Sequence, residues 1–313
     1  MKAMRDVWGQ KLVDLATSNR RLVVLDGDLA NSTKADKFAK AYPSRFFQMG
    51  IAEQNLVGAA AGLAATGYVP WTSSFAVFFT HRALDPIRML VAQSHANVKI
   101  VGSYSGLLIG AVGKTHLDIQ DLAIMRAMPD MTVIAPADET ELLAVMDWAD
   151  STPGPVYLRI VRDPVPDIIA PGYSFTPGAV HELRRGTDIA LVGTGPQTGR
   201  LLAVHDELAK DGVSAAVIHV PCLKPIDTGR LLELLGGHDL VVTAEEHSVH
   251  GGLGGLVAET LTAHGSAPRL ERIGIDDTWG ESAPNDFMLD KHGLSAERIT
   301  ARIKAVLAHR VTS

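Results

Sequence analysis

The sequence predicts an α/β fold of two domains, and three observations support this prediction. Short apolar runs alternate with longer amphipathic segments, which is the pattern of a parallel sheet covered by helices. The 313 residues exceed the usual size of one hydrophobic core. A proline-rich connector interrupts the alternation, so we expect a domain at 1–163, a linker at 164–180 and a domain at 181–313.

In the first domain, strands and helices are expected to alternate to the end. We expect strands at 21–25, 45–49, 69–74, 98–102, 131–135 and 155–162. We expect helices at 7–18, from about 53 to 65, at 121–127 and at 137–150, the last one capped by Asp138 or a neighbour. Phe75, Phe78 and His81 recur at every third residue, which places them on one face of a further helix.

The second domain repeats the alternation. We expect strands at 189–192, 214–219, 240–244 and 270–273, and a last helix at 295–308. The glycine cluster at 193–199 follows a strand and opens a helix, but it lacks the Gly-x-Gly-x-x-Gly spacing of a dinucleotide site. A nucleotide-binding oxidoreductase is therefore a disfavoured alternative.

Composition excludes several classes of function. The formal net charge is −6 and Lys and Arg do not cluster, so we expect no nucleic-acid partner. Apolar runs stay shorter than the roughly 18 residues of a membrane span, so we expect no membrane partner. The single cysteine, Cys222, cannot form an internal disulfide, and the N-terminus lacks an apolar signal core. We therefore expect a cytoplasmic location.

Glu53 is the first candidate for a functional residue. It lies in the first turn of a helix that continues mainly with glycine and alanine, so another backbone can approach closely. The helix dipole favours a carboxylate there by about 0.3–1 kcal/mol, and the local sequence alone favours this structural role over a functional one. The second candidate is the glycine-rich loop 103–116, which follows a strand at the edge where α/β sheets bind ligands.

Five sequence blocks resemble those of transketolases, thiamine diphosphate enzymes that transfer two-carbon ketol units. In the family's order, they are Asp28–Ser32, Gly50–Asn55, Ser73–Phe78, Thr115–His116 and Met125–Pro129. The first half of the chain, to about residue 162, resembles the pyrimidine-binding domain of this family. The remainder, to about residue 307, resembles its C-terminal domain. The resemblance thus implies a thiamine-diphosphate pyrimidine-binding fold followed by a transketolase C-terminal α/β domain.

The resemblance implies two catalytic residues. Glu53 matches the glutamate that hydrogen-bonds a pyrimidine ring nitrogen of the cofactor and so promotes loss of the thiazolium proton. A buried carboxyl group suits that work. His116 matches a histidine that faces the hydroxyl groups of the substrate, where an imidazole can hydrogen-bond or shuttle a proton.

The resemblance also implies cofactor contacts. Phe78 matches the ring that stacks on the aminopyrimidine, and Phe75 lines the same pocket. From spacing alone, an aromatic stripe of this kind is equally typical of a core. His81, at a position more often aromatic in the family, and Asp28, in the first matching block, are the other expected cofactor residues.

Substrate contacts are expected at five positions. Ser32, Arg162 and Arg5 are candidates for contacts to a sugar phosphate, although a loop serine and exposed charges would fit the local sequence equally well. Tyr104 stands where the family usually has a histidine for the phosphate, and Val112 where it usually has an aspartate for the hydroxyl beside the carbonyl. Loss of that acceptor removes a hydrogen bond. We therefore expect a preference for deoxy, branched or otherwise modified sugars.

The resemblance covers only part of a full transketolase. The diphosphate-binding domain, whose Gly-Asp-Gly motif holds magnesium, is not matched, and 26–28 has these residue types in the wrong order. We therefore expect half a cofactor site, with the magnesium ligands on a separate N-terminal subunit. The expected assembly is a heterotetramer in which two copies of this chain meet at the small-residue helix after Glu53.

Two further alternatives remain open at this point. One is another thiamine diphosphate enzyme, either the β subunit of a 2-oxo-acid dehydrogenase or a relative of deoxyxylulose-phosphate synthase, which the block Ser74–Phe78 disfavours. The other is a non-catalytic regulatory subunit that keeps the fold. The presence of Glu53, Phe78 and His116 together argues against that role, whereas Val112 and Tyr104 leave it open.

Overall fold

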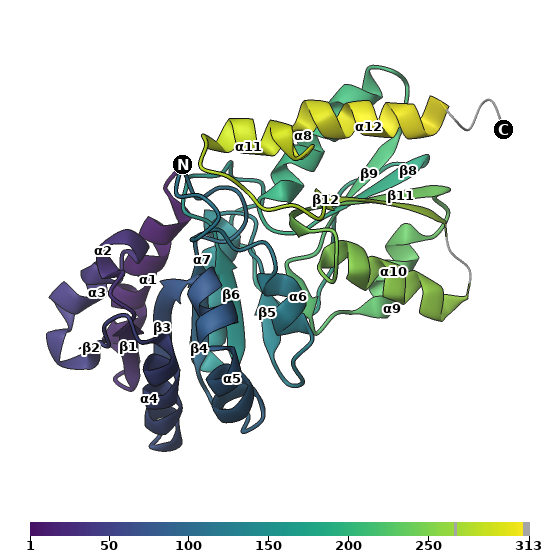
Figure 1. The fold of residues 1–313 in the computed structure, drawn as a ribbon. Helices are drawn as coiled ribbons and strands as arrows, with labels where there is room; N and C mark the ends of the chain where they lie inside the picture. The colour runs from purple at the N-terminus through teal and green to yellow at the C-terminus, as the bar shows by residue number, and fades with distance from the viewer. Residues whose placement is uncertain (266–267, 309–313) are drawn as a thin grey trace.

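The computed structural model describes residues 1–265 and 268–308, and it confirms the two-domain α/β fold (Figure 1). Each domain is built around one mainly parallel sheet with helices on both faces. Within the described residues, the helices are too short or too polar to cross a lipid bilayer.

The first sheet has the strand order β10-β5-β6-β4-β3-β1-β2. Its strands from the first half of the chain are β1 (Leu22–Asp26), β2 (Phe46–Gln48), β3 (Val69–Phe75), β4 (Lys99–Ser103), β5 (Thr132–Ile134) and β6 (Val156–Ile160). These six strands pair in parallel, so their carboxyl ends lie at one edge of the sheet. All six strands predicted for this domain are present.

Two layers of helices cover this sheet. They are α1 (Met4–Ser18), α2 (Ala30–Thr33), α3 (Asp36–Ala41), α4 (Glu53–Ala65), α5 (Leu84–Pro86), α6 (Asp121–Arg126) and α7 (Glu139–Ser151). Side chains alternate along β1: Leu22 and Val24 join the core under α1 and α7, whereas Val23 and Leu25 join the core under α4. The expected cap of α7 is confirmed, because the Asp138 carboxylate accepts a hydrogen bond from the Glu141 backbone N–H at 3.0 Å.

The predicted helical stripe of Phe75, Phe78 and His81 is wrong. Phe75 ends strand β3, and the helical turn that begins at Ala76 continues as the π-helix Phe78–Arg82. The spacing of three residues therefore does not describe a single helical face. The rings of Phe75 and Phe78 nevertheless stack, with centroids 5.9 Å apart, across the passage from the strand to the helix.

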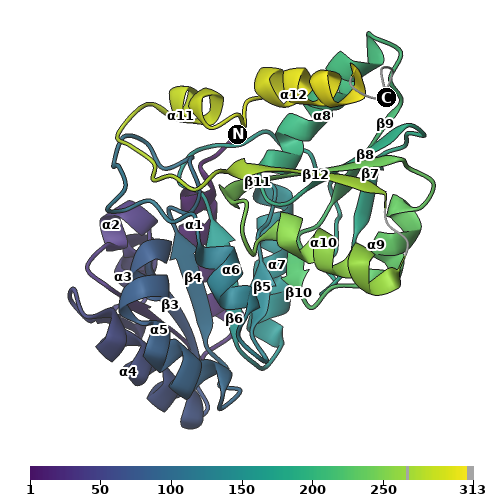
Figure 2. The same cartoon turned by 45° about the vertical axis from the view of Figure 1, so that its right-hand side comes forward.

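The second sheet has the order β12-β11-β8-β9-β7. Its strands are β7 (His181–Arg184), β8 (Ile189–Gly193), β9 (Ala215–His219), β11 (Leu240–Ser248) and β12 (Arg269–Ile275). The helices are α8 (Gln197–Ala209), α9 (Thr228–Leu235), α10 (Leu253–His264), α11 (Asn285–Lys291) and α12 (Ala296–Ala308). Figures 1 and 2 show α8 and α12 on one face and α9 and α10 on the other.

Two strands in the second half were not predicted. The edge strand β7 pairs antiparallel with β9. The short strand β10 (Cys222–Lys224) leaves the second domain and pairs antiparallel with β5, so that Cys222 lies opposite Ile134 in the first sheet. Both strands are too short to show a clear period in the sequence.

Buried polar contacts join the two domains. Arg159 in β6 pairs with Asp121 at 2.9 Å and donates to the backbone carbonyl of Glu246 in β11 at 2.8 Å. His219, at the end of β9, lies 2.8 Å from a carboxylate oxygen of Glu141 in α7. The carboxyl ends of the second sheet are thereby fixed against the first domain.

Candidate active site

The predicted site residues gather at the carboxyl edge of the first sheet. Strands β6, β4, β3 and β1 are neighbours in that order, so the residues that follow them lie side by side. Phe75 ends β3, Tyr104 follows β4 and Arg162 follows β6. Ligands of open α/β sheets bind outside this edge. The topology therefore brings together residues that lie far apart in the sequence.

Glu53 is the first residue of α4, and its side chain is fully buried. One carboxylate oxygen accepts a hydrogen bond of 3.1 Å from the Ser74 hydroxyl at the end of β3. The other forms an ion pair of 2.6 Å with Arg82. Gly27 allows this close packing, because a Cβ there would lie 3.4 Å from Glu53 Oε1 and 3.2 Å from Ser74 Oγ. Burial and directed contacts separate Glu53 from an ordinary helix-end charge.

An aromatic cluster lies beside this carboxylate. The rings of Phe75 and Tyr104 stack with centroids 4.0 Å apart. The ring of His116 meets Phe78 edge-on at 5.5 Å and Phe75 at 5.9 Å, and its Nδ1 lies 2.8 Å from the Thr115 hydroxyl. The structure thus brings the loop of Tyr104 and His116 against the two phenylalanines. An aromatic cluster of this kind can pack on the planar ring of a ligand.

Two arginines converge on the hydroxyl group of Tyr104. Arg5 donates to it at 2.6 Å and Arg162 at 3.2 Å, and the hydroxyl lies 3.4 Å from the backbone carbonyl of Ser32. Arg162 also pairs with Asp163 at 2.9 Å. Ser32 contributes its carbonyl, whereas its hydroxyl donates to Asn31 at 3.3 Å. Two guanidinium groups with one adjacent carboxylate suit an anionic ligand.

The backbone of Tyr104 adopts a φ of +60°, a left-handed conformation that is strained for a residue with a large side chain. Backbone strain of this kind persists where the surroundings hold it, and it is concentrated at functional sites. Here, the ring stack with Phe75 and the two arginine contacts hold it. Tyr104 is therefore the residue that connects the aromatic cluster with the cationic cluster.

Three predicted residues lie outside this contact network within the described part of the chain. Asp28 is exposed in a turn, with a φ of +68°, and its backbone N–H donates to Gln48 at 2.9 Å. His81 is exposed on the π-helix next to Arg82. Val112 is exposed near the tip of the loop. Their expected roles in cofactor and substrate binding stay predictions.

The second domain holds the loop in place. Asn285, at the start of α11, accepts a hydrogen bond of 2.9 Å from the Gly110 backbone N–H and donates to Asp163 at 2.6 Å. The Ser282 hydroxyl donates to the carbonyl of Ala111 at 2.6 Å. Sequence reasoning missed Asn285, and the sequence around it gives no signal. It also missed Arg82. Arg82 follows Phe78 by four positions, a spacing at which a cation can reach an aromatic ring on the same helical segment.

Two buried carboxyl groups, Asp26 and Asp118, hold the elements that carry the site residues. Burial raises the pKa of Asp26, which accepts a hydrogen bond of 2.7 Å from the Leu29 backbone N–H. Burial, with the charge of Asp121, raises the pKa of Asp118, which accepts a hydrogen bond of 2.5 Å from the Thr80 hydroxyl. The Asp118 contact fastens the end of the loop to the π-helix. Both groups therefore position the elements that carry the candidate residues.

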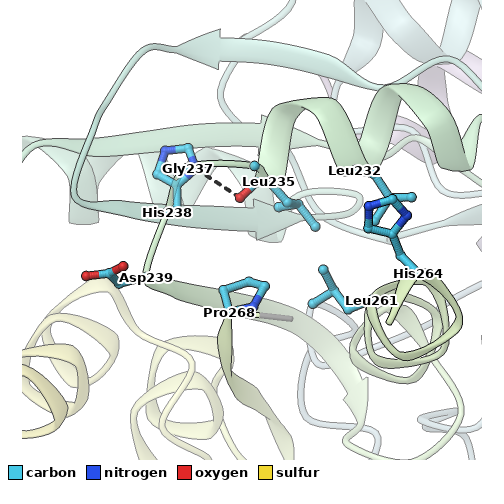
Figure 3. Close-up of a pocket in the computed structure, with 9 residues that line it drawn as sticks. Leu232, Leu235, Gly237, His238, Asp239, Leu261, His264 and Pro268 are labelled. Carbon is cyan, nitrogen blue, oxygen red and sulfur yellow. Dashed lines mark hydrogen bonds between the residues drawn. The ribbon is translucent and has the colours of Figure 1, made fainter. Parts of the chain in front are cut away.

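A separate hollow of about 380 Å³ lies between α9 and α10 in the second domain (Figure 3). Leu235, Leu261, His238 and His264 line it, and it opens at the amino end of β11. That end lies opposite the edge where sheets of this kind bind ligands.

Within residues 1–265 and 268–308, no group of three or more His, Cys, Asp or Glu side chains is arranged to hold a metal ion.

Comparisons with known proteins identify the family of both domains. The family described as "Transketolase, pyrimidine binding domain" matches residues 1–167, and "Transketolase, C-terminal domain" matches residues 178–299. A 6-deoxy-6-sulfo-D-fructose transketolase subunit from Clostridium sp. (strain MSTE9) is 38% identical over 309 residues, covering 99% of this chain and 94% of the relative.

Two other proteins extend the comparison. A subunit of an apulose-4-phosphate transketolase from Actinobacillus succinogenes is 33% identical, covering 95% of this chain and 96% of the relative. A solved structure named "Split gene transketolase, inactive beta4 tetramer" has a TM-score of 0.90 at 42% identity, covering 98% of this chain and 99% of that one. Since both family domains are matched and the relatives align over nearly their whole length, the chain belongs to the transketolase family.

Proposed function

We propose that this chain is the C-terminal subunit of a split, thiamine-diphosphate-dependent transketolase. In this proposal, the complex transfers a two-carbon ketol unit from a ketose to an aldose acceptor. The placement of Glu53 carries the proposal. A fully buried carboxylate begins a helix at the ligand-binding edge of the sheet, next to Phe78 and the other aromatic rings.

The residues present fit the pyrimidine half of this cofactor. Glu53 would hold a proton at a ring nitrogen, while Phe78 and Phe75 would pack on the ring. Gly27 lets the chain pack closely against Oε1 of Glu53 and the Ser74 hydroxyl, so Oε2 is the oxygen that would face the ring. Bound thiamine diphosphate supplies a carbon that can bond to the carbonyl carbon of the donor sugar and stabilise the resulting charge. His116 would orient the sugar hydroxyl groups and exchange protons with them.

The other half of the cofactor site is proposed to lie on a separate N-terminal subunit, which would contribute the diphosphate and magnesium ligands. The similarity to a split-gene transketolase and to named transketolase subunits supports this division. A cytoplasmic location is part of the proposal and is supported by the lone, buried Cys222, which suits a reducing compartment.

A second copy of this chain is proposed to cover α4, giving two copies in a heterotetramer. Gly62 and Ala65 are exposed on this helix, and the large apolar side chains of Ile51, Met89 and Leu90 are exposed near it. Leu90 lies against the helix, since a Cβ at Gly58 would lie 3.9 Å from its side chain. Small residues let two helices approach closely, and the exposed apolar side chains would then be buried.

The substrate is proposed to be a sugar that carries an anionic group, since Arg5 and Arg162 converge at Tyr104. The names of two relatives are consistent with this class, because one contains a sulfo-sugar and the other a sugar phosphate. Val112 places an isopropyl group where an acceptor for the neighbouring hydroxyl was expected. A sugar modified at that hydroxyl or elsewhere, rather than an ordinary pentose phosphate, is therefore the proposed donor.

Reconstitution tests the proposed function. The chain alone is expected to bind thiamine diphosphate weakly in calorimetry, whereas the complex with its diphosphate-binding subunit is expected to bind it in a magnesium-dependent manner. The complex should then transfer a ketol unit between sugar phosphates or sugar sulfonates, measured by mass spectrometry of the products. Micromolar, magnesium-dependent binding by this chain without a partner would contradict the division of the site between two subunits.

A further inference from the structure

Arg82 bridges Glu53 and Phe78, the two groups that the proposed function assigns to the cofactor ring. Its guanidinium nitrogen lies 2.6 Å from Glu53 Oε2, and its central carbon lies 4.6 Å from the centroid of the Phe78 ring. The guanidinium group is planar, donates N–H groups in its plane and packs its face on aromatic rings. It therefore meets both groups that a nitrogen-containing ring would meet there, the carboxylate of Glu53 and the face of Phe78.

The local backbone explains this arrangement. Arg82 is the last residue of the π-helix Phe78–Arg82, so that its side chain returns over the first residue of the same segment. Single turns of π-helix are rare and occur frequently at functional sites. Glu53 contacts the guanidinium group from a different element, α4. The two contacts thus come from separate elements and fix one position of the side chain.

From this geometry we propose that Arg82 fills the aminopyrimidine position in the free subunit and is displaced when thiamine diphosphate binds. The inference rests on the proposed function, because it assumes that Glu53 and Phe78 contact the cofactor. A ring that packs on Phe78 and hydrogen-bonds Glu53 requires the volume that the guanidinium group now occupies. Arg82 and the cofactor therefore compete for the same two partners.

The difference in exposure between the two charged side chains makes such an exchange possible. The Glu53 side chain is 1% exposed, so a partner is needed when no cofactor is bound. The Arg82 side chain is 41% exposed, so that it can turn outward into water. An ion pair with one solvated member is weak compared with a fully buried pair. Arg82 thus stabilises the Glu53 carboxylate in the free subunit and can still be displaced by the cofactor.

Calorimetric binding of thiamine diphosphate to the assembled complex tests this inference. Arg82→Ala removes the competitor and should lower the dissociation constant about threefold to tenfold. Arg82→Lys keeps a charge for Glu53 and should bind close to wild type. The matched control is Arg88→Ala, since Arg88 lies on the next helical segment in an exposed pair with Asp85 and should not change the affinity.

Thermal unfolding supplies a second measurement, because loss of Arg82 leaves a buried carboxylate without its cation. Arg82→Ala should lower the Tm of the free subunit more than the Tm of the cofactor-loaded complex. If Arg82→Ala does not fold alone, Arg82→Gln, which keeps a hydrogen-bond donor, replaces it in both measurements with the same expected directions.

The outcomes separate this inference from the proposed function. Unchanged or weaker binding by the Arg82→Ala or Arg82→Gln complex, with intact binding by wild type, would overturn the competition and leave the proposed function standing. Absence of binding by the wild-type complex and by every variant would overturn both. Tighter binding by the alanine or glutamine variant, with the lysine variant and the Arg88→Ala control unchanged, is the result that supports the role of Arg82.

Discussion

The hydroxyl group of Ser74 donates a hydrogen bond of 3.1 Å to the carboxylate of Glu53, and both side chains are fully buried. Ser74 comes from the end of β3, whereas Glu53 begins α4. The contact fixes the position of one carboxylate oxygen, Oε1. The other oxygen is left to face the aromatic side of the site, where it now meets Arg82.

Glu53→Gln tests the proton-holding role of this carboxylate. The amide keeps an acceptor for Ser74 and nearly the same volume, but it cannot deliver a proton to a ring nitrogen. Exchange of the thiazolium C2 proton in the assembled complex should slow by a factor of about 10²–10⁴, the usual contribution of a general acid or base. Quenched deuterium exchange followed by NMR measures this rate.

Glu139→Gln is the matched control, since Glu139 is likewise the first residue of its helix, α7, but pairs with Lys2 on the surface. It should leave the exchange rate unchanged. Wild-type exchange in the Glu53→Gln complex would show that Glu53 only stabilises the start of α4.

Tyr104→Phe tests the cationic cluster. The substitution keeps the ring stack with Phe75 but removes the hydroxyl that accepts hydrogen bonds from Arg5 and Arg162. The arginines then lose their common anchor, at about 0.5–1.5 kcal/mol per hydrogen bond. The kcat/KM for an anionic donor sugar should fall about twofold to tenfold, mainly through KM, whereas a neutral analogue should be affected little.

Steady-state kinetics with a phosphorylated or sulfonated sugar and with its neutral counterpart makes this comparison. Tyr68→Phe serves as the control, because Tyr68 is an exposed tyrosine just before β3. An equal loss for charged and neutral substrates would mean that the cluster does not recognise the anionic group.

The buried pair of Glu141 and His219 predicts loss of stability in acid. Burial opposes ionisation of Glu141, but the charge and hydrogen bond of His219 outweigh it and lower the pKa of the carboxyl group below its usual 4.5. A lowered pKa in the folded state means that the unfolded chain binds the proton first as the pH falls. The stabilisation is therefore complete well above pH 4.5 and is lost as the pH falls through the lower, folded-state pKa.

Urea unfolding between pH 7 and pH 3 measures this effect. Glu141→Gln should lower the free energy of unfolding at pH 7 by about 1–3 kcal/mol, because it weakens the buried hydrogen bonds of this side chain to His219 and to the Ala137 backbone N–H. The variant should also lose less stability than wild type when the pH falls. Parallel pH curves for the two proteins would show that Glu141 does not contribute to acid unfolding.

Much of the fold could be predicted because its signals are local. The six parallel strands of the first sheet each show a short apolar run, and the Asp138 cap lies next to the helix that it begins. The short strands β7 and β10 and the π-helix of Phe78–Arg82 have no such signal. Their conformations depend on pairing with distant strands and on packing against α4.

The residues of the site could be named from the sequence, but most of their contacts could not. Arg5 and Tyr104 are 99 positions apart and Glu53 and Arg82 are 29 positions apart, so only the folded chain shows that they meet. Asn285 lies 175 positions from the glycine that it holds. The resemblance supplied roles for individual residues, whereas the sheet topology supplies the clusters in which they act.

Val112→Asp tests how the loop reads the substrate. Val112 is 40% exposed, and the backbone before it is held by hydrogen bonds from the Gly110 N–H to Asn285 and from the Ser282 hydroxyl to the Ala111 carbonyl. An aspartate should therefore fit without disturbing the loop, and it would restore an acceptor for the hydroxyl beside the carbonyl. One hydrogen bond to that hydroxyl is worth about 0.5–1.5 kcal/mol, or roughly twofold to tenfold in kcat/KM.

The measurement compares kcat/KM for ordinary pentose and hexose phosphates with that for a sugar modified at this hydroxyl. Val112→Asp should raise the value for the ordinary sugars and leave or lower it for the modified one, so that the ratio shifts by up to about tenfold. Val112→Asn, which adds a neutral acceptor of the same shape, should shift the ratio in the same direction by less. If wild type already uses ordinary sugar phosphates efficiently and Val112→Asp changes neither value, the loop does not read this hydroxyl, and substrate selection must depend on the cationic cluster at Tyr104.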